Sequence, residues 1–346
     1  MEIRNPNFFE APDFWMSGWE DVNAYLDTLK TGHVWEIGRS EGGHPIRAVA
    51  YGGKEPVART ASLSAAVAAG HPESFFGAEK RRKQVLVILS AIHGGEIEGT
   101  VSCVNFASLM ETGADLRGRR WDALKEAAAA MRVVLVPLAQ PDGRIRSAVK
   151  NMIGGSTDDL YYYGQGVQKN GEILRWPACK RKQPIPLDEM AFLGGYYNDA
   201  GVNIQHEDFF APNLAPETRA LIDLVRDEVP DAFLTLHSCG SGPFFTGPDA
   251  FIPQAHQYRQ AQVAAVVGDR HRRDGLRPGG SPKHGPTGGF YFHTALHHTS
   301  GALPLLLEFP HGLKTKPFTF DEILDIGLST FEEVMRFGLT HGFRPA

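Results

Sequence analysis

Four short apolar runs recur along the chain, separated by polar and charged segments. They occupy residues 85–89, 132–138, 232–236 and 303–307. Nearly continuous apolar runs of this length, rich in valine and leucine, are typical of strands that are buried on both faces, as in a parallel sheet. We therefore predict a buried sheet whose strands are supplied one after another along the chain.

Segments in which apolar residues recur at helical spacing lie between and around these runs. A pair of strands, 33–37 and 45–51, is predicted around a glycine-rich turn. Strands that alternate with helices predict an α/β protein with a mixed, mostly parallel central sheet and helices on both faces. Helices are expected over residues 19–29, 100–110, 121–131, 216–228, 254–272 and 320–337.

The remaining segments are less regular. Residues 53–84 are interpreted as a surface insertion, and residues 279–289 as a flexible glycine-rich loop. Residues 144–200 have little periodicity, and we expect so long an irregular segment to line a substrate cleft. Since no internal repeat or low-complexity linker interrupts the sequence, we expect a single domain over residues 1–346, with its core at about 19–337.

Composition and charge argue against several classes of protein. The chain has 42% hydrophobic and 22% charged residues and a net charge of −5, which gives no reason to expect nucleic acid or an anionic membrane as partner. The longest apolar runs are far too short to cross a membrane. The N-terminal residues lack a basic region followed by an apolar run, so we expect no signal peptide. Together with three widely spaced cysteines, which imply no disulfide framework, this favours a cytoplasmic location.

Residues that can bind a metal follow three of the four apolar runs. His93 and Glu96 come shortly after the first run, His237 follows the third, and Glu308 follows the fourth. Because the carboxyl ends of parallel strands meet at one edge of a sheet, these side chains are expected to lie together. Two histidines and a glutamate form a ligand set that leaves zinc a fourth position for water. Glu308 is then placed to take the proton of that water as general base.

The order and spacing of these four residues resemble those of the zinc carboxypeptidases of the carboxypeptidase A type. The resemblance extends over most of the length of the sequence. The ordered set of motifs is more specific than His-x-x-Glu alone. The matching stretches are the opening hairpin EIGRSEGGHPIRAVAYG (36–52), the ligand pair HGGE (93–96), the turn QPDG (140–143), the third-ligand strand LTLHS (234–238) and the glutamate strand LLLEFP (305–310).

The resemblance implies a zinc-dependent hydrolase that acts on a peptide or a small amide. It implies one zinc ion per chain, bound by His93, Glu96 and His237, with Glu308 as general base. Enzymes of this kind cleave by direct attack of water, without an acyl-enzyme. The zinc ion and a nearby cation stabilise the oxyanion.

Further candidates follow from positions in the family pattern. Arg175, Lys180 and Arg181 fall in the window where the family has its oxyanion-stabilising arginine, and we expect Arg181 to take that role. The tyrosine of the family's mobile loop corresponds by position to His284, and Tyr291 lies just beyond it. Both are expected to contact substrate.

The sequence departs from the family at the motif that binds a substrate's terminal carboxylate. Asn203 stands where the family has an aspartate that orients the first zinc histidine, and Gln205 and His206 stand where it has Asn-Arg. A histidine cannot reproduce the bidentate grip of arginine on a carboxylate. We therefore expect Gln205, His206 and Ser238 to contact substrate, but with altered recognition of its terminus.

Three functions of different class remain open. The first is a carboxypeptidase-like peptidase, and the second is a deacylase of N-acyl amino acids that resembles aspartoacylase and succinylglutamate desuccinylase. The third is a zinc-loaded but inactive binding module, which the presence of Glu308 disfavours. His293, His297 and His298 have helical spacing but lack the internal glutamate of HExxH, so we interpret them as the polar face of a helix.

Overall fold

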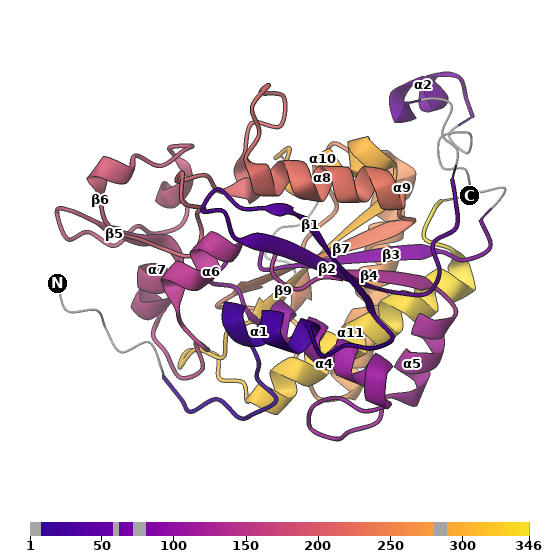
Figure 1. Ribbon diagram of the computed structural model, residues 1–346, viewed down its shortest axis with the longest axis horizontal. Coiled ribbons are helices and arrows are strands. Elements are labelled where there is room, and N and C mark those ends of the chain that lie inside the picture. The colour runs from indigo at the N-terminus through magenta and orange to yellow at the C-terminus, as the bar shows by residue number, and fades with distance from the viewer. Residues whose placement is uncertain (1–7, 58–61, 72–80, 280–288, 346) are drawn as a thin grey trace.

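A mixed seven-stranded sheet forms the centre of the molecule, and helices cover both of its faces (Figure 1). The computed structural model describes residues 8–57, 62–71, 81–279 and 289–345. The strand order in the sheet is β1-β2-β4-β3-β7-β9-β8. The bounds are β1 (His33–Arg39), β2 (Pro45–Tyr51), β3 (Val85–Ser90), β4 (Arg132–Val136), β7 (Ala232–Cys239), β8 (Phe244–Phe245) and β9 (Leu303–Pro310).

The four central strands run parallel, and antiparallel strands close both edges. Strands β4, β3, β7 and β9 are parallel neighbours. The antiparallel pair of β1 and β2 joins β4 at one edge, and β8 pairs antiparallel with β9 at the other. The predicted mixed α/β sheet is thus confirmed. Because the central strands are parallel, the segments that follow them meet at one edge of the sheet.

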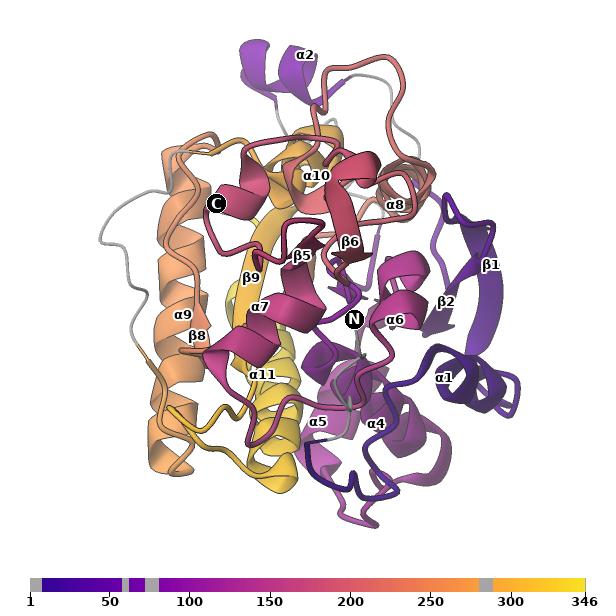
Figure 2. The same cartoon turned by 90° about the vertical axis from the view of Figure 1, so that its left-hand side faces the viewer.

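Both faces of the sheet are buried. In β3, Leu86 and Ile88 belong to one apolar core, and Val87 and Leu89 belong to the other, since successive side chains of a strand point to opposite faces. The two layers of helices are visible in Figures 1 and 2. The first core is lined by α1 (Trp19–Leu26), α4 (Glu98–Thr112), α5 (Asp122–Ala129), α9 (Gln254–Arg273) and α11 (Phe320–His341), and the second by α8 (Pro216–Glu228) and α10 (Phe292–Ser300).

Strands β7 and β9 are longer than the sequence pattern predicts. We expected them to end at residues 236 and 307, but the parallel ladder continues to the pairs Ser238 with Phe309 and Cys239 with Pro310. The backbone hydrogen bonds of the ladder therefore hold His237 and Glu308 within regular strands. Ladder pairing fixes side-chain direction more firmly than a loop would.

The segment predicted to be irregular, residues 144–200, contains several regular elements. A capping box formed by Ser156 and Asp159 begins α7, and Tyr162 of that helix stacks on Phe192 of β6 with ring centroids 5.2 Å apart. The segment is rich in glycine and tyrosine and shows no regular spacing of apolar residues, because tertiary packing rather than local propensity stabilises its elements. The elements are α7 (Thr157–Gln165), β5 (Gly166–Gln168), β6 (Met190–Leu193) and the 3₁₀ turns η2 (Ala178–Lys180) and η3 (Leu187–Glu189).

The sequence QPDG, predicted as a turn, begins a helix. The side chain of Gln140 caps α6 (Pro141–Ser147) because its Oε1 accepts a hydrogen bond from the backbone N–H of Gly143 at 2.6 Å. Proline at the first helical position is compatible with such a start, since its missing N–H needs no partner there.

Parts of two predicted segments lie outside the described residues. A short helix, α2 (Leu63–Ala68), lies within the predicted surface insertion at 53–84, whose residues 58–61 and 72–80 are not described. Most of the predicted loop at 279–289 is likewise outside the described ranges. Among the helices that can be described, none combines the length and apolar character needed to cross a lipid bilayer.

Candidate metal centre

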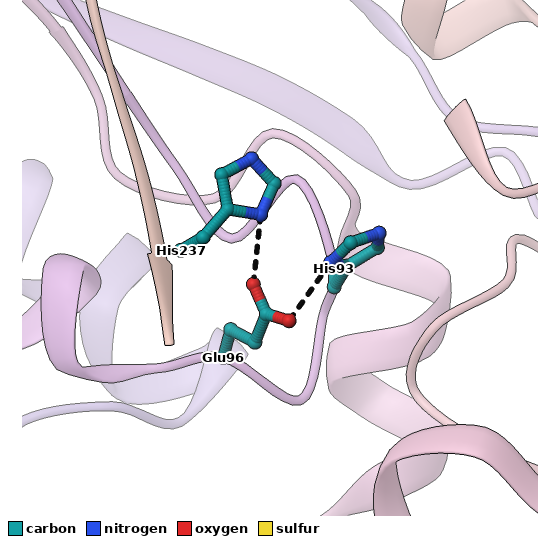
Figure 3. Close-up of side chains that lie close together, drawn as sticks. All are labelled: His93, Glu96 and His237. Atoms are coloured by element: carbon teal, nitrogen blue, oxygen red, sulfur yellow. Dashed lines mark hydrogen bonds and ion pairs between the residues drawn. The ribbon is translucent and has the colours of Figure 1, made fainter. Parts of the chain in front are cut away.

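The sheet brings His93, Glu96 and His237 together in one buried cluster (Figure 3). His93 and Glu96 lie on the loop between β3 and α4, and His237 lies on the neighbouring strand β7. Glu96 Oε1 is 2.9 Å from His93 Nδ1, and Glu96 Oε2 is 2.9 Å from His237 Nδ1. The three potential ligand atoms lie within 4.8 Å of one another. The cluster predicted from the strand ends is therefore present in the fold.

A second contact sets the orientation of the His93 ring. His93 Nε2 is 3.1 Å from Asn203 Oδ1, which can only accept a hydrogen bond, so Nε2 carries the proton and Nδ1 is directed at the cluster. The same Oδ1 accepts a hydrogen bond from the backbone N–H of Gln205. The ring of Tyr196 stacks on His93 with centroids 3.6 Å apart. Asn203 thus performs the orienting contact that a carboxylate often makes to a metal-binding histidine.

The charges in the cluster suit a divalent metal ion. Burial by itself would raise the pKa of Glu96, but the two histidines lower it below the ordinary value, so that the carboxylate is ionised. Burial also lowers the pKa of His93, which favours the neutral imidazole. Two imidazole nitrogens and one carboxylate oxygen form the donor set that zinc prefers when one position is left for water. The residues present therefore fit a zinc ion.

Gly94 and Gly143 each lie where another segment of backbone approaches closely. A Cβ added to Gly94 would lie 2.1 Å from the backbone N of Arg144, and one added to Gly143 would lie 2.3 Å from the backbone O of Gly195. No side chain can be accommodated at such distances. Gly94 is thus required by the close approach of α6, and Gly143 by the close approach of the backbone at Gly195.

The cluster opens into a cavity of about 570 Å³. Glu308 lines this cavity from β9, directly beside His237 in the strand register. Burial, together with the negative charge of Glu96, raises the pKa of Glu308 to about 7. Its Oε2 has no hydrogen-bond partner among the described residues. A carboxylate in this state can accept a proton from a group bound in the cavity.

Most of the other predicted contacts also line the cavity. They are Gln205, His206, Ser238 and Tyr291. The rings of His206 and Tyr291 are in edge contact, with centroids 4.9 Å apart. His284 lies outside the described residues.

Arg181 does not reach the cavity. Its side chain is exposed just after the 3₁₀ turn η2, whereas the preceding Lys180 is partly buried and lines the cavity. Arg175, the third cation in the same window, is exposed and pairs with Asp158 at 2.8 Å. Successive residues of a turn point in different directions, so the choice among adjacent cations could not be made from spacing alone.

His293 is a functional candidate that sequence reasoning assigned wrongly. We interpreted it as part of a polar helix face, yet it is 3% exposed and lines the cavity. Its Nε2 is 2.6 Å from Asp249 Oδ1, and its Nδ1 is 3.1 Å from Gln205 Nε2. These partners are distant in sequence, and no local pattern could have identified them.

A buried pair, Glu98 and His311, is hydrogen-bonded to Ser238, the residue that follows His237. Ser238 Oγ donates to Glu98 Oε2 at 2.6 Å, while its backbone N–H donates to Glu96. His311 Nδ1 is 2.8 Å from the other oxygen of Glu98. Ser238, which we expected to contact substrate, therefore donates its hydroxyl to Glu98 and its backbone N–H to the candidate ligand Glu96.

Comparison with known proteins agrees with the fold and identifies the family. Two solved structures with similar folds are a metallo-carboxypeptidase from Burkholderia cenocepacia (16% identity, TM-score 0.58, covering 94% of this chain and 71% of that chain) and carboxypeptidase A from Helicoverpa armigera (16% identity, TM-score 0.53, covering 93% and 73%). At this identity the likeness shows a shared fold. No curated protein sequence matches the chain significantly. Residues 22–273, however, match the zinc carboxypeptidase family, Peptidase_M14, and since this match spans well over half of the sequence, the chain belongs to that family of zinc-dependent metallopeptidases.

Proposed function

We propose that this metallopeptidase hydrolyses peptide or amide bonds with one zinc ion held by His93, Glu96 and His237 and with Glu308 as general base. The proposal is carried by the convergence of three metal donors within 4.8 Å and a further carboxylate on the same cavity. A zinc ion bound there supplies a Lewis acid that polarises the scissile carbonyl and lowers the pKa of a bound water.

Glu308 performs the proton transfers. Its unpartnered Oε2 accepts the proton of the attacking water and passes it to the leaving amine. The position of Glu308 opposite His237 in the ladder supports this role, because the base is held beside the metal ligand by backbone pairing. No acyl-enzyme is required, since water itself is the nucleophile.

Lys180 stabilises the oxyanion of the tetrahedral intermediate. We assign this role to Lys180 in place of Arg181, since only Lys180 of the two lines the cavity. Burial is the main cause of the lowered pKa of His93 and of His206, and the charge of Lys180 adds to that lowering. A fixed cation near the metal centre stabilises negative charge that develops during the reaction.

The proposal is tested by metal content and turnover together. Plasma mass spectrometry is expected to find close to one zinc ion per chain in the wild type and in Glu308→Gln, and none in His93→Ala. Turnover of N-blocked dipeptides is expected to fall by roughly 100-fold or more in Glu308→Gln, because removal of a general base typically costs this much. The exposed His341→Ala serves as the matched control for His93→Ala.

Three outcomes would contradict the proposal in different ways. A wild-type chain that binds no zinc would exclude the metal mechanism. Cleavage of N-acyl amino acids without cleavage of peptides would favour the deacylase. Zinc binding with no turnover of either substrate class would assign the chain as a binding module.

A further inference from the structure

One end of the cavity contains a buried hydrogen-bonded chain of three side chains. Asp249, His293 and Gln205 are 2%, 3% and 5% exposed. Asp249 precedes α9, His293 lies on α10, and Gln205 lies on the 3₁₀ turn η4 (Ile204–His206). Gln205 and His293 both line the cavity. The chain therefore links a buried carboxylate to an amide in the cavity wall.

The direction of the hydrogen bonds follows from the carboxylate. Although burial alone would raise the pKa of Asp249, its histidine partner lowers it, so the group is ionised and can only accept. Asp249 Oδ2 accepts from Gln260 Nε2 at 2.8 Å, and Oδ1 accepts from His293 Nε2 at 2.6 Å. His293 Nδ1 then accepts from Gln205 Nε2 at 3.1 Å. The amide nitrogen of Gln205 is thereby committed to His293.

The remaining atom of this amide is an acceptor without a partner. Gln205 Oε1 is buried and has no hydrogen-bond partner within the described parts of the chain. Buried polar atoms are almost always paired, so an acceptor in a cavity wall that lacks a protein partner is available to water or to a ligand group that enters the cavity. Because a carbonyl oxygen only accepts, the complementary group must carry an N–H or O–H.

The surroundings do not favour a terminal carboxylate at this place. A carboxylate would set its own acceptor oxygens against Gln205 Oε1. His206, which follows Gln205, contacts Tyr291, and burial lowers the pKa of His206 to about 2, so this histidine contributes no positive charge. No arginine is found among the described residues of the cavity wall. The part of the cavity that the structure describes therefore lacks a guanidinium group that could bind a carboxylate with two hydrogen bonds.

An ammonium group is also a poor fit. It would exchange its hydration for one neutral acceptor, and it would enter a cavity that already holds the charge of Lys180 and, in the loaded enzyme, of zinc. A neutral donor loses less hydration free energy on burial and is not repelled by these positive charges. Primary amides and hydroxyls are groups of this kind.

We propose that Gln205, oriented by His293 and Asp249, selects substrates that present a neutral hydrogen-bond donor, such as a primary carboxamide, where related peptidases accept a free carboxylate. The inference rests on the proposed hydrolysis and specifies its substrate class. Gln205 contacts the substrate directly. His293 and Asp249 are positioning residues that keep its carbonyl oxygen facing the cavity.

The test compares two forms of one substrate. N-benzoylglycyl dipeptides with C-terminal phenylalanine, lysine or glutamate are assayed as free acids and as primary amides with the zinc-loaded wild type. We expect kcat/KM to favour the amide by at least tenfold in the best pair. A ratio near one in every pair, or a preference for the acid, overturns the inference.

Variants assign the preference to Gln205. Gln205→Leu is expected to bring the amide-to-acid ratio of kcat/KM close to one. Gln205→Arg is expected to reverse the preference towards the acid, because the guanidinium of arginine can bind a carboxylate with two hydrogen bonds. Gln254→Arg, an exposed substitution on α9, is the matched control and is expected to keep the wild-type ratio. An acid preference that disappears in Lys180→Gln would instead assign carboxylate binding to Lys180 and overturn the inference.

Binding separates the failure of this inference from the failure of the proposed function. Isothermal titration calorimetry with the Glu308→Gln variant measures affinity for both forms without turnover. If the wild type cleaves neither form but the variant binds the amide at least tenfold more tightly, hydrolysis fails and the inference stands. Equal binding, tighter binding of the acid, or binding of neither form overturns the inference whatever the activity.

Discussion

Glu308 lies directly opposite His237 in the register of the parallel strands β9 and β7. Neighbouring strands in a sheet are about 4.8 Å apart, so the ladder itself fixes how far the proposed base lies from a metal ligand. Residues on flexible loops would need other contacts to reach the same arrangement. This geometry explains why these strands must continue beyond the apolar runs that define them in the sequence.

Asn203 should control metal affinity more than folding. Asn203→Ala removes the acceptor that orients His93, and loss of such an outer contact typically weakens metal binding by about 10- to 100-fold. Asn203→Asp should bind zinc at least as tightly as the wild type, because a carboxylate accepts the same hydrogen bond. Competition with a zinc chelator measures both affinities. Equal affinity in the alanine variant and the wild type would contradict the orienting role.

Lys180 and Arg181 should differ sharply in their effect on turnover. Lys180→Met is expected to lower kcat by about 100- to 1,000-fold, the range seen when an oxyanion-stabilising donor is lost. Arg181→Met should leave kcat nearly unchanged, because Arg181 is exposed outside the cavity. The neighbouring substitution is therefore an internal control. Steady-state kinetics decides between the two, and the reverse result would restore Arg181 as the cation.

Gly94→Ala should destabilise the protein. The new Cβ would lie 2.1 Å from a backbone nitrogen, which cannot move aside as a flexible side chain can. We expect a loss of at least about 2 kcal/mol in the free energy of unfolding, together with weaker zinc binding. At Gly53 the same substitution meets no atom within 4 Å and should have little effect. Urea denaturation of the metal-free proteins measures both.

His271 should make the protein less stable in mild acid. This histidine is buried on α9 beside Thr330, and burial lowers its pKa from 6.5 to about 4. Between these two values the unfolded chain binds a proton that the folded chain does not, so stability falls as the pH decreases. From pH 7.5 to pH 5 this amounts to about 2 kcal/mol.

Exchange of His271 for a residue that does not titrate should reduce that loss. His271→Gln keeps a polar side chain beside Thr330, and its stability should depend less on pH between 7.5 and 5 than that of the wild type. His341→Gln, at the exposed end of α11, is the comparison variant. Thermal unfolding across this pH range is the measurement, and identical slopes for wild type and His271→Gln would contradict the assignment.

The candidate metal cluster could be predicted because its residues follow local signals. His93, Glu96, His237 and Glu308 each come at or after the end of an apolar strand, and parallel pairing brings such ends together. The sheet was likewise predicted from the apolar runs, and most helices from the helical spacing of their apolar residues. The close approach of two backbones at Gly94 was indicated only by the glycine itself.

The substrate end of the cavity could not be predicted in the same way. His293 is paired with a carboxylate 44 residues away and an amide 88 residues away, so its role depends on tertiary contacts alone. The choice between Lys180 and Arg181 depends on how one turn is oriented in the fold. Within residues 144–200, α7 is stabilised by its contacts with β6 and lacks the regular apolar spacing by which a helix is usually identified.

The position of β9 near the end of the chain means that the proposed zinc ligands are synthesised before the proposed general base. All three proposed zinc ligands are present once residue 237 has been made, and they come from β7 and from the loop after the neighbouring β3. Glu308 arrives about 70 residues later, on a strand that must insert beside β7. A chain that ends before residue 303 would carry the proposed ligand set without the proposed base, so the order of the strands would delay the proposed hydrolysis until β9 is made.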